Sequence, residues 1–429
     1  MHLNQISRRR SRWLPWLAAA TAVSCLAAYP AAAASGTAAH PQAALDCGPP
    51  DYFIQCYSPQ AYELAYGIAP LLSQGIDGRG ETVVLPELAE PPSSMGVTYT
   101  DIRQDMAAFD SQFDLPAATL NVVNTIARSK TPYVTGTEEA EDTEMVHAIA
   151  PGATLDVVLV PNTAGSSAAA FASAITRVVD AAVALHAGVI SFSASAGEHL
   201  LTSAEVAQVN AALERARQQH VTFVASSGDT GVISDDGPPR QVSLPASDPL
   251  VLAVGGTVLD ARPAGTYLGE MAWNEGSVAS AGGYSSLFSR PSYQAGVPGI
   301  GATRGVPDVA ANADSSTAMA VALSGSSSLL PAEGTSAATP LWAGVIALAD
   351  QEAGHPLGFV NTALYAIARG PAYHQAFHDV IAGDNSVIWP TGVFAGYTAG
   401  PGWDPVTGWG SPDAQYLVPL LAHVAYSGT

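Results

Sequence analysis

The sequence predicts an α/β fold built around a doubly wound, mainly parallel sheet. Short apolar runs alternate with segments whose apolar residues recur about every 3.6 positions, a pattern typical of strands and helices in parallel sheets. The chain has 429 residues, of which 48% are hydrophobic and 40 are glycine, so one large or two ordinary domains are possible. We see no internal repeat and no linker that would separate a second domain.

Helices and strands are expected to alternate along the chain. We expect helices over 57–72, 100–109, 138–149, 166–186 and 202–219. We expect strands over 81–85, 153–160, 189–193, 221–225, 250–254 and 318–323. Thr202 and Glu205 have the spacing of a capping box, which would start the helix over 202–219. Loops at the carboxyl ends of the parallel strands are the places where a functional site is expected.

The first 34 residues are predicted to be a signal peptide. Arg8, Arg9 and Arg10 precede an apolar stretch at 13–28 that is short for a membrane span, and a cleavage site follows at about Ala34. We therefore expect a secreted protein without membrane attachment after signal removal. The twin-arginine and Sec export routes both stay open.

Residues 35–56 are predicted to form an N-terminal leader. It holds Cys47 and Cys56, the two cysteines that follow the signal peptide. In an oxidising compartment they could pair and close a short loop, and the sequence leaves open whether they do.

The charge of the chain restricts its partners. The formal net charge is −21, with 37 acidic residues against 16 lysines and arginines. Nucleic acid and anionic membranes are therefore not expected as partners.

Ser336 stands between a loop and an apolar helix. Gly334 and Thr335 precede it, the apolar run 341–348 follows, and Pro340 is expected in the first turn of the helix. Unpaired backbone N–H groups at such a helix start could stabilise an oxyanion formed by attack of the serine hydroxyl. For an isolated Gly-Thr-Ser sequence, an N-capping serine is the commoner explanation.

Glu138 and Asp142 are four residues apart and share one face of a predicted helix. On spacing alone, a solvated acidic face is the commoner explanation, because Glu139, Glu141 and Glu144 lie alongside. The alternative is a hydrogen-bonded pair in which one carboxyl keeps its proton and orients the other.

Asp229 follows an apolar strand and begins an Asp-Thr-Gly triplet. Such a residue often only makes a turn. The triplet also occurs in pepsin-like proteases, which need a second copy on an all-β body, and in subtilisins, which need a His-Gly motif. Neither requirement is met, since no histidine here is followed by glycine, and His147 falls on a different helix face from the two carboxylates.

Together these motifs resemble the sedolisin (serine-carboxyl peptidase) family. The matching segments run in order from about Tyr57 to near the C-terminus; they include Glu138 with Asp142, 147–153, 227–231, 245–247, 254–257, 290–294, 306–310 and Ser336 with Pro340. The resemblance implies a subtilisin-like fold with a single catalytic domain over 57–429. It also implies a monomeric endopeptidase that hydrolyses polypeptides at acid pH.

The resemblance assigns a role to each residue of the site. Ser336 would be the nucleophile, Glu138 its general base, Asp142 the residue that orients the base, and Asp229 the oxyanion donor. Physical chemistry agrees with acid catalysis, because a carboxylate base with a pKa near ~4 stays ionised where imidazole would be charged. A carboxylic acid can donate to an oxyanion only while it is protonated.

The family also binds one calcium ion near its C-terminus. Asp379 and Asp404 would supply carboxylate oxygens, and Val380, Gly400 and Gly402 would supply backbone carbonyl oxygens. Hard oxygen ligands from two loops suit Ca²⁺.

Three features depart from the family pattern. Little sequence separates the predicted signal from the catalytic segment, where the family usually carries a long propeptide. Glu333 stands where a small residue is usual, and Ala281 where a glycine-rich run is usual.

The alternative function is a non-catalytic, secreted, peptide-binding member of the same fold. The sequence leaves open the cleavage preference and the choice between endopeptidase and exopeptidase action.

Overall fold

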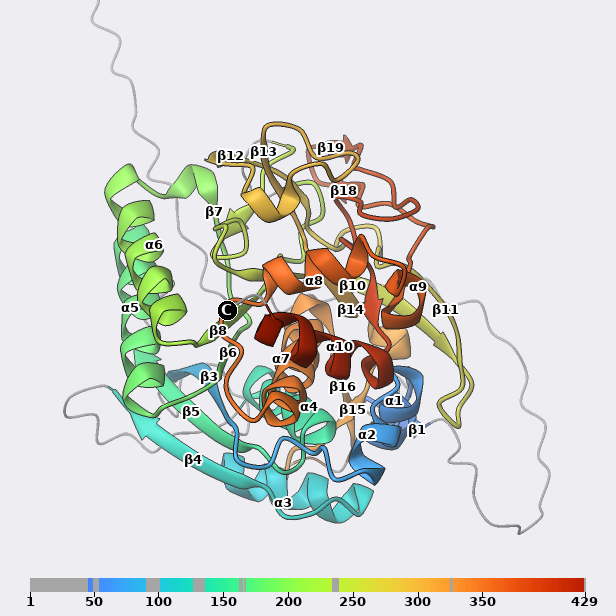
Figure 1. The fold of residues 1–429 in the computed structure, drawn as a ribbon. Coiled ribbons are helices and arrows are strands. Elements are labelled where there is room, and N and C mark those ends of the chain that lie inside the picture. Colours follow the sequence, from blue (N-terminus) through green and yellow to red (C-terminus); the bar gives the residue numbers. More distant parts are fainter. Residues whose placement is uncertain are drawn as a thin grey trace, which may run out of the picture.

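The computed structural model describes residues 45–48, 54–89, 101–125, 136–161, 165, 167–233, 239–324, 326 and 328–427. The predicted signal peptide lies outside them. An eight-stranded, mainly parallel sheet crosses the molecule, with helices on both faces (Figure 1). The predicted α/β class with a parallel sheet is therefore confirmed.

The sheet has the strand order β11-β10-β8-β6-β3-β5-β4, with β14 also pairing with β10. All of its pairings are parallel except that of β10 with β11. The strands are β3 (Thr82–Ala89), β4 (Thr119–Asn124), β5 (Thr154–Pro161), β6 (Val189–Phe192), β8 (Thr222–Ser226), β10 (Leu252–Ala261), β11 (Tyr267–Ala272) and β14 (Val309–Asn312).

Alternating side chains of the strands face two separate cores. In β3, Val83 and Leu85 pack into one core, while Val84 packs into the other. This period of two is what a sheet buried on both faces requires. The helices α5 (Ala168–Ala184) and α6 (Ser203–Gln218) cover the Val84 face, on the left of Figure 1.

The opposite face is covered by α4 (Thr137–Ile149), α7 (Gly334–Ala353) and α10 (Ala414–Ser427). The α7 helix is almost wholly buried, because its sequence is apolar on all sides. Smaller helices surround this layer: α1 (Pro59–Ala65), α2 (Ala69–Ser73), α3 (Ile102–Phe113), α8 (Asn361–Ala368) and α9 (Tyr373–Ala376).

Two predicted elements differ from those observed. The helix expected over 57–72 is divided into α1 and α2 at Gly67, which has a φ of +69° and lies against the Asp413 side chain. Glycine adopts this left-handed conformation, which ends α1, and a Cβ would have no room beside Asp413. The strand expected over 318–323 shortens to β15 (Ala320–Val321). The capping box of Thr202 and Glu205 is confirmed at the start of α6.

Small antiparallel pairs complete the fold. Cys47 and Cys56 are joined by a disulfide across the hairpin of β1 (Leu45–Cys47) and β2 (Ile54–Cys56). The others are β7 (Ala196–Gly197) with β9 (Ser243–Leu244), β12 (Gly283–Ser289) with β13 (Thr303–Val306), β15 with β16 (Leu330–Pro331), β17 (Phe377–His378) with β20 (Ser411–Pro412), and β18 (Val387–Trp389) with β19 (Gly392–Phe394). Among the described residues, no helix combines the length and apolarity needed to cross a membrane.

Candidate active site

Ser336 lies in the first turn of α7, which begins at Gly334. Its backbone N–H therefore has no carbonyl four residues earlier in the helix and remains available as a donor. Gly334 has a φ of +80°, and a Cβ there would stand 2.8 Å from an Asp229 oxygen. Glycine thus allows the helix start and Asp229 to approach each other closely.

Pro340 lies one turn further into α7 than expected. The helix starts at Gly334, so Pro340 is inside it rather than in its first turn. A proline has no N–H to donate to the carbonyl four residues earlier, which here belongs to Ser336. The Ser193 hydroxyl approaches that carbonyl at 3.4 Å instead. Pro340 therefore leaves the carbonyl of Ser336, the candidate nucleophile, without its usual hydrogen bond within the helix.

The acidic residues of α4 are buried, which overturns the interpretation of a solvated acidic face. Glu139, Glu141, Asp142 and Glu144 are each at most 7% exposed, while Glu138 is partly exposed. The helix is enclosed by α3, α7 and α1, and its carboxylates accept backbone hydrogen bonds from neighbouring segments. The donors include the N–H groups of Gly136 to Glu139, Glu333 to Glu141 and Ala322 to Glu144.

The Ser336 hydroxyl lies close enough to the Glu138 carboxyl to favour its ionised form. Burial and the nearby Asp142 charge raise the pKa of Glu138 well above its usual value, and the Ser336 hydroxyl opposes that rise. The Ser336 Oγ atom also lies 3.4 Å from the Ser193 carbonyl oxygen. The structure therefore brings a hydroxyl and a carboxyl into the contact that a nucleophile and its base require.

Asp142 is held by two residues that the sequence analysis did not select. Ser193 donates a hydrogen bond to Asp142 Oδ1 at 2.8 Å. The carboxyl of Glu87, 4% exposed, lies against that of Asp142. Burial raises the pKa of Asp142 to about 7 and that of Glu87 well above its usual value.

A proton shared by Glu87 and Asp142 explains this contact. Within the described residues, Glu87 Oε1 and Asp142 Oδ2 are buried and have no N–H or O–H donor. A proton between the two carboxyls satisfies both oxygens, whereas two facing carboxylates would repel each other. Glu87, Asp142 and Glu138 thus form one titrating unit, which we call the acid cluster.

The strand register brings Glu87 and Ser193 together. Val84 of β3 pairs with Ile190 of β6, and continuing this register three residues further, just past the end of β6, puts Ser193 level with Glu87. That row lies at the carboxyl edge of the sheet, where sites of α/β proteins are expected. Glu87 interrupts an otherwise apolar strand, which was the available sequence signal; Ser193 had none.

Asp229 lies just beyond the carboxyl end of β8 and faces the start of α7. Its Oδ1 accepts hydrogen bonds from the Thr335 N–H at 2.8 Å and the Thr335 hydroxyl at 2.7 Å. Burial raises the pKa of Asp229 above its usual value, and the two Thr335 bonds oppose that rise. Since both Thr335 donors occupy Oδ1, Oδ2 remains free to carry a proton toward an oxyanion beside Ser336.

His147 takes no part in this arrangement. Its Nε2 lies 3.0 Å from Asp110 Oδ1 and 2.9 Å from the Pro116 carbonyl oxygen, and the side chain is fully buried. It therefore faces α3, in agreement with the prediction that it lies on a different face of α4 from Glu138 and Asp142. The four predicted catalytic residues come together without an imidazole.

The predicted calcium ligands also gather in one place. Both Asp379 oxygens lie 3.1 Å from the Gly402 N–H, and Asp404 Oδ2 lies 3.1 Å from the Gly400 N–H. Among the described residues, no hydrogen bond reaches the carbonyl oxygens of Val380, Gly400 or Gly402. Asp404 also accepts hydrogen bonds from Val406 and Thr407, so both of its oxygens already have donors. Two carboxylates and three open carbonyls on adjoining loops are oxygen ligands of the kind that Ca²⁺ takes. The described residues hold no group of three or more His, Cys, Asp or Glu side chains suited to a metal ion, but the predicted site uses only two such side chains.

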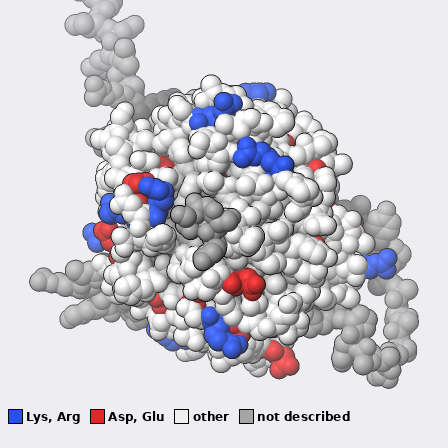
Figure 2. Space-filling view, in the orientation of Figure 1, with Lys and Arg blue, Asp and Glu red and all other residues white. Residues whose placement is uncertain are grey.

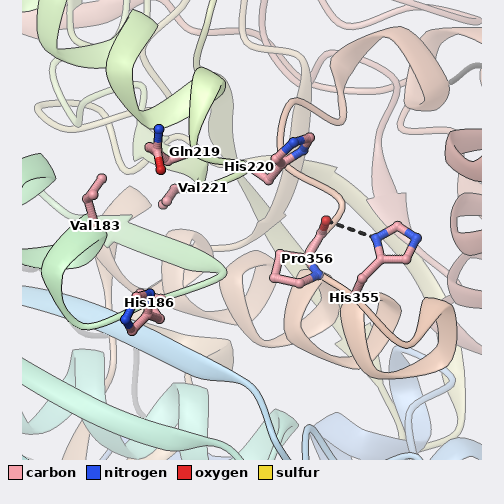
Figure 3. Close-up of a pocket in the computed structure, with 8 residues that line it drawn as sticks. Val183, His186, Gln219, His220, Val221, His355 and Pro356 are labelled. Atoms are coloured by element: carbon pink, nitrogen blue, oxygen red, sulfur yellow. Dashed lines mark hydrogen bonds between the residues drawn. The ribbon is translucent and has the colours of Figure 1, made fainter.

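A separate pocket of about 420 Å³ lies at the opposite edge of the sheet (Figure 3). Three exposed histidines, His186, His220 and His355, line it, and they come from the turns before β6 and β8 and after α7. It contains none of the predicted site residues. The candidate chemistry thus lies at the carboxyl edge of the strands, away from this pocket.

Comparison with known proteins places this arrangement in a family. The family model described as "Subtilase family" matches residues 132–366, which is more than half of the chain. The chain belongs to the subtilase family. The matched segment includes Glu138, Asp142, Asp229 and Ser336.

The relatives of this chain include the peptidases kumamolisin and tripeptidyl-peptidase 1. Kumamolisin from Bacillus sp. (strain MN-32) is 35% identical over 386 residues, covering 86% of this chain and 65% of kumamolisin. Human tripeptidyl-peptidase 1 is 32% identical over 250 residues, covering 52% of this chain and 41% of that protein. This subtilase therefore spans less than two thirds of the length of these relatives.

Structural comparison gives the same result. The solved structure of Pseudomonas sedolisin, a serine-carboxyl proteinase, has a TM-score of 0.73 and 27% identity, and covers 88% of this chain and 100% of that chain. The predicted subtilisin-like fold and the sedolisin resemblance of this subtilase are confirmed.

Proposed function

We propose that this subtilase is a secreted serine-carboxyl endopeptidase that hydrolyses polypeptides at acid pH. The observation that carries the proposal is the contact between Ser336 and Glu138, with Asp229 placed at the same helix start. Glu138 takes the hydroxyl proton as Ser336 attacks the scissile carbonyl, and Asp142 orients Glu138. Protonated Asp229 and the Ser336 N–H then stabilise the oxyanion.

The acid cluster and Asp229 together set the expected pH dependence. The base becomes available once the cluster loses a proton, which the raised pKa of Glu138 delays, and the raised pKa of Asp229 lets that side chain keep its proton above the usual range. Hydrolysis should therefore rise as the cluster ionises and fall as Asp229 loses its proton, which gives a bell-shaped profile.

Titration with a mechanism-based serine label, followed by digestion of a denatured protein, tests the proposal. The wild type should form one adduct at Ser336 and release internal fragments, whereas Ser336→Ala and Glu138→Gln should lose hydrolysis and keep the fold. Ser326→Ala, at an exposed serine, is the matched control. Peptide binding without adduct or cleavage would instead identify a non-catalytic member. Sequential release of tripeptides, the activity named in tripeptidyl-peptidase 1, would replace the endopeptidase assignment.

We also propose that Asp379, Asp404 and the carbonyl groups of Val380, Gly400 and Gly402 hold one structural Ca²⁺. The ion would neutralise two carboxylates and connect the loops that bear them. Chelation and Asp379→Asn should both lower the melting temperature, because ligand at a hundredfold excess over its Kd stabilises a fold by about 2.7 kcal/mol. Asp384→Asn is the control in the same segment. Calorimetric titration showing no calcium binding, or equal melting with and without chelator, would remove the site.

A further inference from the structure

The hairpin of β18 and β19 exposes an apolar face. Ile388 and Val393 are directly opposed across the two strands and are 61% and 73% exposed. They are the most exposed large apolar side chains among the described residues. Two β-branched residues placed side by side form a continuous apolar surface rather than isolated exposed positions.

The other face of the hairpin fixes it to the body. Val387 is fully buried and packs with Val232, Ile233 and Ala279, and Trp389 and Phe394 pack against the same group. A two-stranded hairpin alone is marginally stable in water, so this packing is what holds it in one position. The exposed pair is therefore presented on a fixed support.

The support is continuous with the loop of Asp229. The Asp229 carbonyl accepts a hydrogen bond from the Ala279 N–H, and the Ala279 carbonyl accepts one from the Gly231 N–H. Next to these residues, the Val232 N–H donates to the Asn385 carbonyl at 3.1 Å, and the Ile388 N–H donates to the Gly276 carbonyl at 2.7 Å. Three adjoining segments thus connect the candidate oxyanion donor with the hairpin.

The free edge of the hairpin favours an extended ligand. Within the part of the chain that the structure describes, β19 pairs only with β18, so its outer edge offers backbone donors and acceptors. An extended peptide can add to such an edge and place alternate side chains on the apolar face. A polypeptide that leads from the active site has both an extended backbone to pair with this edge and apolar side chains to cover the exposed face.

We propose that β18 and β19 bind an extended apolar segment of the polypeptide substrate, outside the residues around the scissile bond. The inference rests on the proposed peptidase function. It makes unfolded chains the preferred substrate class, because folded proteins keep their apolar segments buried. Ile388 and Val393 are specificity residues that increase affinity for long substrates without touching the reacting atoms.

Kinetics on two substrate lengths test the proposal. The variant Ile388→Thr/Val393→Thr keeps β-branched side chains and removes apolar surface, so the hairpin should still form. Its KM for a reduced and alkylated protein should rise on the order of tenfold at unchanged kcat. A short fluorogenic peptide should be cleaved as by the wild type. Leu268→Thr, at an exposed strand position 52% accessible on β11, is the matched control and should change neither.

The outcomes separate this inference from the function on which it rests. If the wild type cleaves neither substrate, the peptidase function itself fails. If the short peptide is cleaved and the double variant keeps the wild-type KM for the long substrate, the hairpin does not bind substrate. A wild-type dimer that the double variant converts to a monomer would assign the face to a second copy of the chain and overturn the proposal.

Discussion

At the scale of single residues, the proposed role of Asp229 would link protonation to oxyanion stabilisation. Its pKa is raised by burial, and its Oδ1 is occupied by two donors from Thr335. Ionisation of Asp229 would remove the donor on Oδ2 and place a negative charge beside the oxyanion. The loss of activity at higher pH should therefore depend on this side chain.

We expect Asp229→Asn to keep a reduced activity that persists to higher pH than that of the wild type. The amide can accept from Thr335 through its oxygen and donate through its nitrogen at any pH. The measurement is kcat/KM against pH, with Asp248→Asn, at another buried aspartate, as the control. A basic limb that stays at the wild-type position in Asp229→Asn would contradict this role.

The proposed role of Glu87, which is to position Asp142, can be tested with two substitutions. Glu87→Gln can still donate to Asp142, so its kcat at acid pH should stay close to that of the wild type. Glu87→Ala should lose about tenfold in kcat at unchanged KM, because Asp142 is left buried with an unpaired oxygen, which costs about 1–3 kcal/mol. Equal losses in both variants, or a loss confined to KM, would show that Glu87 does not position Asp142.

At the scale of elements, α4 shows what the sequence could and could not predict. Its span and the shared face of Glu138 and Asp142 followed from spacing. Its burial did not, because a run of five acidic residues resembles a solvated surface unless the donors that satisfy it are known. Those donors, such as Glu333 and Ala322, lie almost two hundred residues away in sequence. Glu87 and Ser193 could not be predicted either, because strand register, and not proximity in the sequence, brings them to the site.

We expect Glu144→Gln to make folding stability less dependent on pH. The pKa of Glu144 is raised well above its usual value by burial, and its Oε2 accepts the Ala322 N–H, a bond that an amide oxygen can also accept. As the pH rises above the usual carboxyl pKa, the free energy of unfolding should fall less steeply than in the wild type, by at most about 1.4 kcal/mol per pH unit. Denaturant titration measures this slope, and exposed Glu352→Gln should leave it unchanged.

At the scale of the whole molecule, the buried carboxyls predict a fold that is more stable at acid than at neutral pH. Burial raises the pKa of Glu63 and Asp142 to about 7, and those of Glu141, Glu144 and Asp350 well above the usual value. A carboxyl with a raised pKa in the folded state stabilises the fold fully below its unfolded pKa. That contribution is lost as the pH rises through the folded value.

We therefore expect the free energy of unfolding of the whole protein to fall as the pH rises from about 5 to 7. The slope should exceed about 1.4 kcal/mol per pH unit, because more than one proton is lost on unfolding in this range. The measurement is the denaturation midpoint of Ser336→Ala, which avoids self-digestion. Stability that increases toward neutral pH would contradict the burial of these groups.

The buried carboxyls also change how the native protein should migrate in an electric field. Composition gives an isoelectric point of about 4.6, on the assumption that every carboxyl titrates freely. On the face shown in Figure 2, acidic side chains are few and scattered among uncharged ones. Since the buried carboxyls keep their protons when the free ones have lost theirs, the folded protein carries less negative charge than its composition implies. The native isoelectric point should accordingly lie above that of the urea-denatured chain, and the separation between the two focused bands reports how many protons the fold retains.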